Sequence, residues 1–488
     1  MAEPHSSISQ NIPSFVDAIL FHASRAPNDP ALGLESGLLT YAQLAEAIYS
    51  ATAACERAGL RPGAIVGLIL NDPVWHICII AALYRLGVVS VSIAPDELDV
   101  LPQGTLAAVL HDAATPLPAG AGGILVDPQW FSLRATADRG ERAFAAHELC
   151  RIAFSSGTTG RPKPIALSPE ILWHRLTTYA FRGRFAASER IFCGPQLRSQ
   201  FGFAISFSAL TFGKMVCFSD NAATSIPVIT SYKADLAIIS VYQLSNMLDV
   251  LEQSNDRLPG LREIQAGGAL ISDVLLQRAR ARLPTEITGT YASTEAGTVA
   301  LAPVERLGAA RGEGAAGFVV PWASVETYDD NGRKLPTGRD GHIRQRTLGM
   351  APVFTPSMRE VVSPEWFDPG DYGRVLNNGM LIVSGRSTEL INIGGNKISP
   401  DRFEQILLQC EGVRDAAVFT VDIKSALPQV WAAIVAEPSI NIANVMKRCF
   451  AEPMLGTPSV IRVVDAIPRN AGGKILRDQL RNELAKAS

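Results

Sequence analysis

The segment 152–164 reads Ile-Ala-Phe-Ser-Ser-Gly-Thr-Thr-Gly-Arg-Pro-Lys-Pro. It begins as a short apolar strand, continues as a run of small Ser, Thr and Gly residues and ends with the cations Arg161 and Lys163. Such a run offers backbone N–H groups, hydroxyl donors and glycines that accept positive φ, which a chain uses to surround a phosphate. A flexible linker is the alternative, but linkers rarely follow a strand and end in Arg-Pro-Lys. No Gly-Lys-Ser/Thr closes the run, so we predict a phosphate loop that is not of the Walker type.

The composition describes a globular protein with more than one domain. A chain of 488 residues exceeds one ordinary core, and 47% hydrophobic with 19% charged residues is not the composition of a disordered chain. The net charge of −3, without a Lys/Arg cluster, predicts no nucleic-acid partner and no acidic membrane surface. Seven scattered cysteines and the lack of an apolar leader favour a cytoplasmic protein with reduced thiols. The most apolar segment, 77–94, is interrupted by Tyr84-Arg85 and Gly87, so it predicts a buried helix and strand and no membrane span.

The pattern of apolar residues predicts an α/β fold with two domains. Helices are expected at 14–26, 41–58, 73–86 and 169–179, and fully apolar strands at 64–70 and 88–93, which favours a parallel, helix-covered sheet. The Gly-, Phe- and Ser-rich segment 194–218 predicts only a strand at its end. Period-2 patches in 312–350 indicate antiparallel β structure, and a helix–strand–strand–helix–strand order follows residue 400. We predict a large domain, 1–385, of helix-covered mixed or parallel sheets with a β-rich subdomain, and a small α+β domain, 386–488.

The phosphate loop closely resembles that of the adenylate-forming superfamily, which includes acyl-CoA synthetases, adenylation domains and firefly luciferase. Three further segments resemble motifs of that family in the same order: 291–295 (Tyr-Ala-Ser-Thr-Glu), 367–371 (Phe-Asp-Pro-Gly-Asp) and 468–477, a Gly-rich loop that contains Lys474. The resemblance covers residues 15–484, and it implies that the small domain is mobile. The chain departs from the family pattern at Pro164, where Gly is usual, and at Thr388, where the hinge often has Asp or Lys.

This resemblance implies a site for ATP and Mg²⁺. The residues it assigns to the triphosphate are Ser155, Ser156, Gly157, Thr158, Thr159, Gly160 and Lys163. The residues it assigns to the adenosine are Gly267, Gly268, Ala269, Tyr291, Asp371 and Arg386, the last two on the ribose. Three residues take catalytic roles: Thr294 donates to the α-phosphate, Glu295 binds the metal ion, and Lys474 bridges the carboxylate, the α-phosphate and the ribose.

The segment 193–204 is expected to form the acid pocket. Arg198 falls at or near the position of a His in many acyl-CoA synthetases. Two interpretations stay open: a loop substitution without a role, or a contact of Arg198 or Gln200 with a polar substrate group. Domains that select α-amino acids usually carry Phe-Asp where this chain has Phe201-Gly202, so the ammonium anchor is missing. The other predicted pocket residues are Phe201, Gly202, Phe203, Ala204, Gly267 and Gly268, which suit an aryl or medium acyl group. Gly394 and Gly395 resemble the loop that lines the thiol tunnel.

The predicted activity is that of an ATP-dependent acid–thiol ligase. It would convert a small-molecule carboxylic acid to an acyl-adenylate and then transfer the acyl group to a thiol. CoA is the expected thiol, because no carrier domain follows Lys474. Two alternatives stay open: a stand-alone adenylation enzyme that loads a carrier protein's phosphopantetheine, and a non-catalytic relic that binds a nucleotide or an acid. Formation of acyl-CoA separates the first two, while Glu295, Asp371 and Lys474 weigh against the relic; a homodimer is compatible with the sequence.

Overall fold

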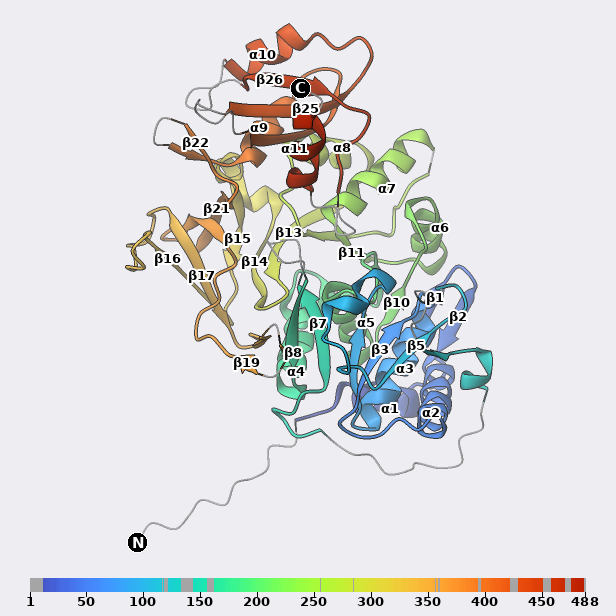
Figure 1. Cartoon of the computed structure of the whole chain (residues 1–488). Coiled ribbons are helices and arrows are strands. Elements are labelled where there is room, and N and C mark those ends of the chain that lie inside the picture. The colour runs from blue at the N-terminus through green and yellow to red at the C-terminus, as the bar shows by residue number, and fades with distance from the viewer. Residues whose placement is uncertain are drawn as a thin grey trace.

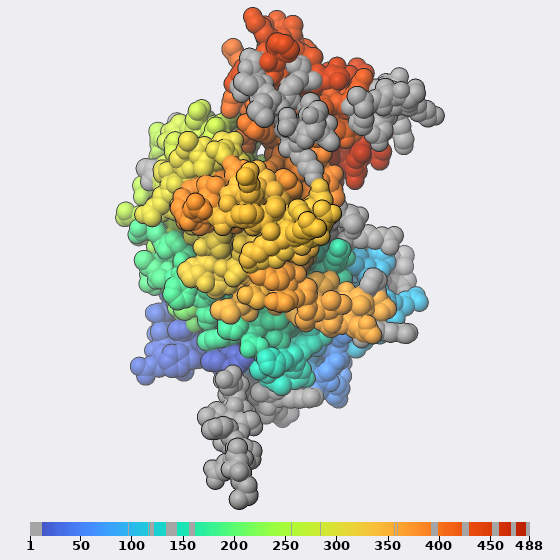
Figure 2. Space-filling view, turned by 90° about the vertical axis from the view of Figure 1, so that its left-hand side faces the viewer, coloured from blue at the N-terminus to red at the C-terminus, as the bar shows by residue number. Residues whose placement is uncertain are grey.

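A large body and a smaller C-terminal lobe make up the structure, a computed structural model (Figure 1). It describes residues 12–115, 117, 122–132, 144–155, 162–254, 256–283, 285–355, 357–358, 360–393, 396–421, 429–450, 458–469 and 475–486. The lobe that carries α9, α10 and α11 stands above the larger body in Figure 2. Among the described helices, none is both long and apolar enough to cross a membrane.

One sheet of the large body carries the phosphate-loop segment at a strand end. Its order is β19-β18-β8-β7-β4-β3-β5-β6, and β7, β4, β3, β5 and β6 run parallel. The bounds are β3 (Ile65–Ile69), β4 (Val89–Ser92), β5 (Ala108–His111), β6 (Ile124–Leu125), β7 (Arg151–Ser155), β8 (Lys163–Leu167), β18 (Val353–Phe354) and β19 (Val361–Val362). The parallel strands β3 and β4 are almost wholly buried, which confirms the expectation drawn from their apolar runs.

The second sheet joins a parallel half to an antiparallel half. Its order is β16-β17-β20-β21-β15-β14-β13-β12-β11-β9-β10-β1-β2. The parallel strands are β1 (Pro30–Leu34), β10 (Met215–Cys217), β9 (Arg190–Cys193), β11 (Leu236–Ser240), β12 (Glu263–Gly267) and β13 (Glu286–Ser293). The antiparallel strands are β2 (Gly37–Thr40), β14 (Gly297–Pro303), β15 (Ala315–Val319), β16 (Ala323–Tyr328), β17 (Gly341–Thr347), β20 (Asp371–Val375) and β21 (Met380–Arg386). The change of direction at β13 therefore lies beside the predicted adenosine residues.

Helices cover these sheets. They are α1 (Phe15–Arg25), α2 (Tyr41–Arg57), α3 (Pro73–Arg85), α4 (Pro169–Thr177), α5 (Gln200–Thr211), α6 (Ala222–Tyr232), α7 (Val241–Gln253) and α8 (Asp273–Arg282), with a 3₁₀ turn η3 (Thr178–Phe181) after α4. The sequence did not predict α5, which begins at Gln200 and is capped by Ser199, whose hydroxyl accepts from Gly202 N at 3.0 Å. Almost every residue of α5 is buried, so no polar face marks it as a helix.

The C-terminal lobe has the predicted element order with an additional helix at its end. A sheet β24-β25-β26 packs with α9 and α10, and the last described helix is α11. The bounds are β22 (Ile391–Ile393), β23 (Asn396–Ile398), α9 (Pro400–Leu408), β24 (Val413–Val421), β25 (Gln429–Ala436), α10 (Ile442–Phe450), β26 (Val460–Val463) and α11 (Arg477–Lys486). The half-buried Arg477 ties α11 to the rest of the lobe through Glu404 (2.7 Å), Asp401 (2.8 Å) and Glu389 (2.9 Å).

Candidate active site

A cavity of about 1920 Å³ lies where the two sheets and the C-terminal lobe meet. It is lined by strand ends of both sheets and by residues of the lobe, including Arg402 of α9 and Arg477 of α11. Nearly every described residue that the sequence predicted for the site lines this one cavity. The exceptions are Gly202 and Phe203.

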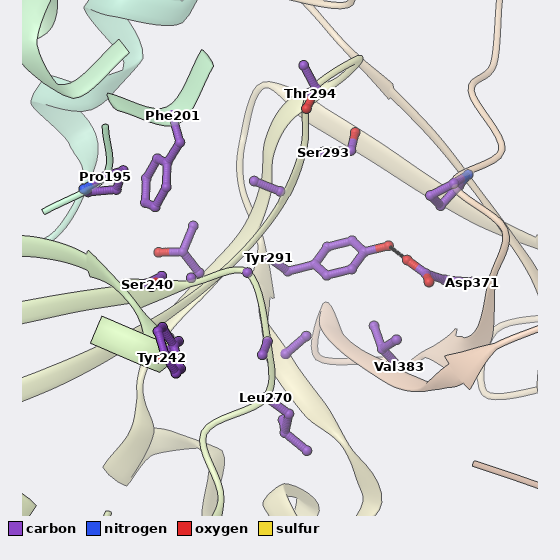
Figure 3. A pocket seen from close by; sticks show the side chains of 18 of the residues that line it. Pro195, Phe201, Ser240, Tyr242, Leu270, Tyr291, Ser293, Thr294, Asp371 and Val383 are labelled. Carbon is purple, nitrogen blue, oxygen red and sulfur yellow. Dashed lines mark hydrogen bonds between the residues drawn. The ribbon is translucent and has the colours of Figure 1, made fainter. Parts of the chain in front are cut away.

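The predicted adenosine residues Tyr291, Asp371 and Arg386 are in direct contact. Tyr291 on β13 points away from Phe201 and towards Asp371, and its hydroxyl donates to the Asp371 carboxylate (Figure 3). Asp371 and Arg386 are paired across β20 and β21, with Arg386 Nε 3.1 Å from Asp371 Oδ1. Burial, together with the Asp371 charge, raises the pKa of Tyr291 well above its usual value. The phenol is therefore a neutral donor beside a buried carboxylate that can accept hydrogen bonds from hydroxyl groups.

The end of β12 forms a narrow wall of the cavity. A Cβ at Gly267 would lie 3.4 Å from Thr290 O and 3.7 Å from Phe201 Cζ, so a side chain here would enter the space between β12 and α5. A Cβ at Gly268 would meet no atom within 4 Å, but the φ of this residue is +90°. The backbone conformation, which glycine adopts without strain, therefore explains the glycine. Ala269 follows and lines the same cavity. The two glycines thus expose bare backbone to the cavity.

The turn at Thr294 and Glu295 is held by an arginine that the sequence analysis missed. Arg175 on α4 donates to Gly349 O (2.7 Å), Thr294 O (2.8 Å) and Glu295 O (2.5 Å). Its side chain is buried, and this burial lowers the pKa of Arg175 to about 10. A sequence signal existed, because Arg175 falls on the buried side of α4 with Leu172 and Leu176. An arginine on an apolar helix face needs buried acceptors, which here are backbone carbonyls.

The two ends of the phosphate loop are described. Ser155 ends β7 and pairs in register with Lys163 at the start of β8, and both line the cavity. Ser155 is buried, and its hydroxyl has no hydrogen-bond partner within the described chain. The other predicted loop residues, Ser156, Gly157, Thr158, Thr159 and Gly160, lie outside the described residues. Gly394, Gly395 and Lys474 also lie outside them.

The acid-pocket prediction needs a correction at Phe203. Phe201 and Ala204, three residues apart on α5, line the cavity, whereas Phe203 does not. Successive residues of a helix turn by about 100°, so Phe203 points to the opposite side. There it is fully buried under the Arg151 guanidinium, 4.3 Å from the ring centroid. Gly202 does not line the cavity either; a Cβ there would lie 2.2 Å from Gln196 O, so this glycine serves close packing.

Arg198 and Gln200, the two polar residues predicted for the acid pocket, both line the cavity. Arg198 Nε donates to Gln196 Oε1 at 2.7 Å, and Arg198 Nη1 lies 3.8 Å from Glu97 Oε2. Gln200 is buried, and both polar atoms of its amide lack a partner among the described residues. The predicted polar contact therefore has two candidates, of which Arg198 already has protein partners.

Comparisons with known proteins agree with this geometry. A family model described as AMP-binding enzyme matches residues 21–354. The fatty acid–[acyl-carrier-protein] ligase ScoC of Streptomyces coeruleorubidus is 26% identical over 510 residues, covering 96% of each chain. The 2-succinylbenzoate–CoA ligase of Listeria monocytogenes is 25% identical over 473 residues, covering 93% of this chain and 97% of its own.

Two solved structures share the fold. The o-succinylbenzoate CoA synthetase (MenE) of Bacillus subtilis, in complex with its acyl-adenylate intermediate, has a TM-score of 0.81 at 20% identity over 95% of this chain and 97% of that chain. ATP-bound MatB of Rhodopseudomonas palustris has a TM-score of 0.81 at 21% identity over 97% of this chain and 99% of that chain. These likenesses confirm the predicted α/β fold.

Proposed function

The chain belongs to the AMP-binding enzyme family, and from that membership we propose that it is an ATP-dependent acid–CoA ligase. A carboxylate oxygen attacks the α-phosphorus of ATP, the bond to the β-phosphate breaks, and pyrophosphate leaves. The sulfur of CoA, having lost its proton, then attacks the acyl carbonyl, and AMP leaves. The observation that carries the proposal is the convergence of the Tyr291–Asp371–Arg386 cluster, the Thr294–Glu295 turn and the ends of the phosphate loop on one cavity.

The chemistry of the donors fits Mg-ATP. Asp371 is a buried carboxylate on a strand end and suits the two ribose hydroxyls, with Arg386 beside it. Among the described residues no group of three or more His, Cys, Asp or Glu side chains could hold a metal ion by itself. That fits Mg²⁺, which usually takes one or two carboxylates and completes its shell with phosphate oxygens and water. Glu295 would supply that carboxylate, and Thr294 would donate to the α-phosphate.

The second half-reaction calls for a different arrangement of the same site. We propose that residues 386–488 rotate against residues 1–385 about the segment near Thr388, which removes Lys474 from the site and brings Gly394 and Gly395 to the CoA thiol. Aryl or medium acyl groups are the proposed acids, because Phe201, Ala204 and Gly267 give the cavity an apolar lining. The cytoplasm, where ATP and CoA are available, is the proposed location.

A carrier protein is the second candidate for the acceptor. ScoC, whose name describes transfer to an acyl carrier protein, covers 96% of this chain. The succinylbenzoate ligase, whose name describes transfer to CoA, covers 93%. Both acceptors present the same phosphopantetheine thiol, so the groups around the reacting atoms do not separate them.

The decisive experiment measures AMP and pyrophosphate from the purified protein with Mg-ATP and a panel of aryl, fatty, dicarboxylic and amino acids, each with and without CoA. Acyl-CoA formation is the expected result. Adenylate formation with acyl transfer only to a phosphopantetheinylated carrier protein would move the proposal to the second acceptor. Failure to bind ATP by calorimetry, together with no turnover of any acid, would overturn the ligase proposal and favour the relic. Light scattering of the same sample tests the predicted homodimer.

A further inference from the structure

Arg151, at the start of β7, links the sheet of the phosphate-loop segment to helix α5. The residue is 2% exposed. Its Nη1 donates to Ser90 Oγ at 3.1 Å and its Nη2 to Ser92 Oγ at 2.9 Å, both on β4. The guanidinium also lies 4.3 Å from the centroid of the Phe203 ring on α5, which runs beside β7 (Figure 1). Since α5 lies between β9 and β10 of the other sheet, one side chain joins the two halves of the large body.

The acceptors of Arg151 are themselves held in place. Ser90 and Arg151 are register partners in the parallel β4–β7 ladder, and Ser92 lies two residues further on the same face. Ser92 Oγ also lies 2.8 Å from Nε2 of the buried His76 on α3. Because this oxygen accepts from Arg151, its own hydrogen can point to His76. The sheet therefore fixes the guanidinium against which Phe203 packs.

The position of Phe203 is coupled to the wall of the acid pocket. Phe203 and Phe207, four residues apart, share one side of α5, and their ring centroids are 4.6 Å apart. Phe201 and Ala204 line the cavity from another side of the same helix. At the beginning of α5, where this wall lies, the Arg151 guanidinium covers the Phe203 ring. A displacement of that ring would therefore move Phe201 and Ala204 with it.

The start of the phosphate loop gives this contact a fixed reference. Arg151 and Ser155 are four residues apart on β7 and lie on one face of the strand, because side chains alternate. Ser155 ends the strand and lines the cavity. The backbone of β7 is paired with β4 on one side and with β8 on the other. The end of β7 therefore keeps its position without the Arg151 side chain.

We propose that Arg151 is a positioning residue for the acid: through Phe203 it sets the Phe201–Ala204 wall relative to the phosphate loop. This inference rests on the proposed function. In adenylation the carboxylate must lie in line with the α-phosphorus, and a misplacement of about 1 Å can cost about a hundredfold in rate. Arg151 does not line the cavity, so it acts through α5 and not by contact with a substrate.

The test replaces Arg151 by Met, which keeps the length of the side chain but removes its charge and both hydrogen bonds. The complete enzyme is assayed by pyrophosphate release with Mg-ATP, CoA and four probe acids: benzoate, 3-phenylpropanoate, hexanoate and octanoate. We expect KM for the acid to rise about tenfold, with a changed order of kcat/KM among the acids, while KM for Mg-ATP changes less than about twofold. KM values and ratios of kcat/KM do not depend on the folded fraction, so a loss of stability alone cannot produce this result.

Arg85→Met is the matched control. Arg85 is also buried and lies over an aromatic ring, 5.1 Å from the centroid of Tyr49, but it does not line the cavity. We expect this variant to melt at a lower temperature with wild-type KM values. An Arg151→Met enzyme that behaves in the same way would refute the positioning role and leave the proposed function standing. No pyrophosphate release by the wild-type enzyme with any probe acid would overturn the proposed acid class, and this inference with it.

Phe203→Leu tests the route through α5, since it removes the ring and keeps an apolar side chain outside the cavity. If Arg151 acts through Phe203, the double variant should lose no more than the more impaired single variant, because two changes in one path are not additive. Additive losses would refute this route. If Arg151→Met does not fold, Phe203→Leu decides, and a wild-type KM for the acid in that variant would overturn the inference.

Discussion

Replacing Arg175 by Lys should displace the Thr294–Glu295 turn while both residues of the turn are kept. The substitution therefore tests whether the position of the turn matters for activity. The Arg175 guanidinium donates to three backbone carbonyls at 2.5–2.8 Å, those of Thr294, Glu295 and Gly349. It therefore fixes α4, the turn and the segment after β17 to one another. A lysine ammonium keeps the charge but cannot reach three divergent acceptors in one plane. At least one buried carbonyl would lose its donor.

The size of the effect follows from that count. A hydrogen bond to a charged group contributes about 1.5–3 kcal/mol, and about 1.4 kcal/mol corresponds to a factor of ten in rate. Loss of one bond that holds the turn should lower kcat for adenylation about ten- to hundredfold. Because Glu295 would hold Mg²⁺, the Mg²⁺ concentration for half-maximal activity should rise as well, while the KM for the acid should change little.

Pyrophosphate exchange at a series of Mg²⁺ concentrations, with thermal unfolding measured in parallel, checks this prediction. Arg184→Lys, an exposed site with the same substitution, should behave as wild type. A variant of Arg175 that melts at a lower temperature but keeps the wild-type kcat and Mg²⁺ dependence would refute the positioning role. The arginine would then only stabilise the fold.

Three further predictions concern other parts of the molecule. Asp371→Asn keeps an acceptor for Tyr291 but removes the charge, so the KM for ATP should rise about ten- to hundredfold, measured by steady-state kinetics. Lys474→Ala should abolish adenylation while calorimetry still shows ATP binding, and wild-type rates would refute the role of Lys474. Burial lowers the pKa of His76 from 6.5 to about 3. The folded state then excludes a proton that the unfolded chain binds, so stability should fall by about 1.4 kcal/mol per pH unit below pH 6.5. His76→Gln should flatten this slope in denaturant titrations at pH 6.5 and 5.5.

The sequence predicted those features that depend on short-range patterns. Uninterrupted apolar runs predicted the parallel strands β3 and β4. The motifs around Tyr291 and Asp371 predicted strand ends that line one cavity. Each of these signals lies within a few consecutive residues. A local pattern is enough to identify them, because the backbone geometry of the strand or turn fixes the side-chain direction.

Features that depend on distant partners could not be predicted in this way. Arg175 meets acceptors that lie 119, 120 and 174 residues further along the chain. Helix α5 is buried on all sides, so its sequence lacks the periodicity that reveals a surface helix. Because this helix was not predicted, the direction of each side chain around its axis was unknown. Phe203 was therefore expected in the pocket, whereas it lies under Arg151.

Among the buried arginines of the large body, Arg151, Arg175 and Arg182 differ in how their charge is accommodated. Arg175 has three carbonyl acceptors, and Arg151 donates to the hydroxyls of Ser90 (3.1 Å) and Ser92 (2.9 Å) while it lies over Phe203. Arg182 lies over the Tyr179 ring, 4.0 Å from its centroid, and its Nε and Nη1 have no acceptor within the described chain, as is also true of Arg151 Nε. Arg175 shows that this fold can surround a buried guanidinium with acceptors. The two guanidiniums that keep an unpartnered nitrogen both lie over an aromatic ring, so the ring face supplies part of the attraction that carbonyl acceptors supply around Arg175.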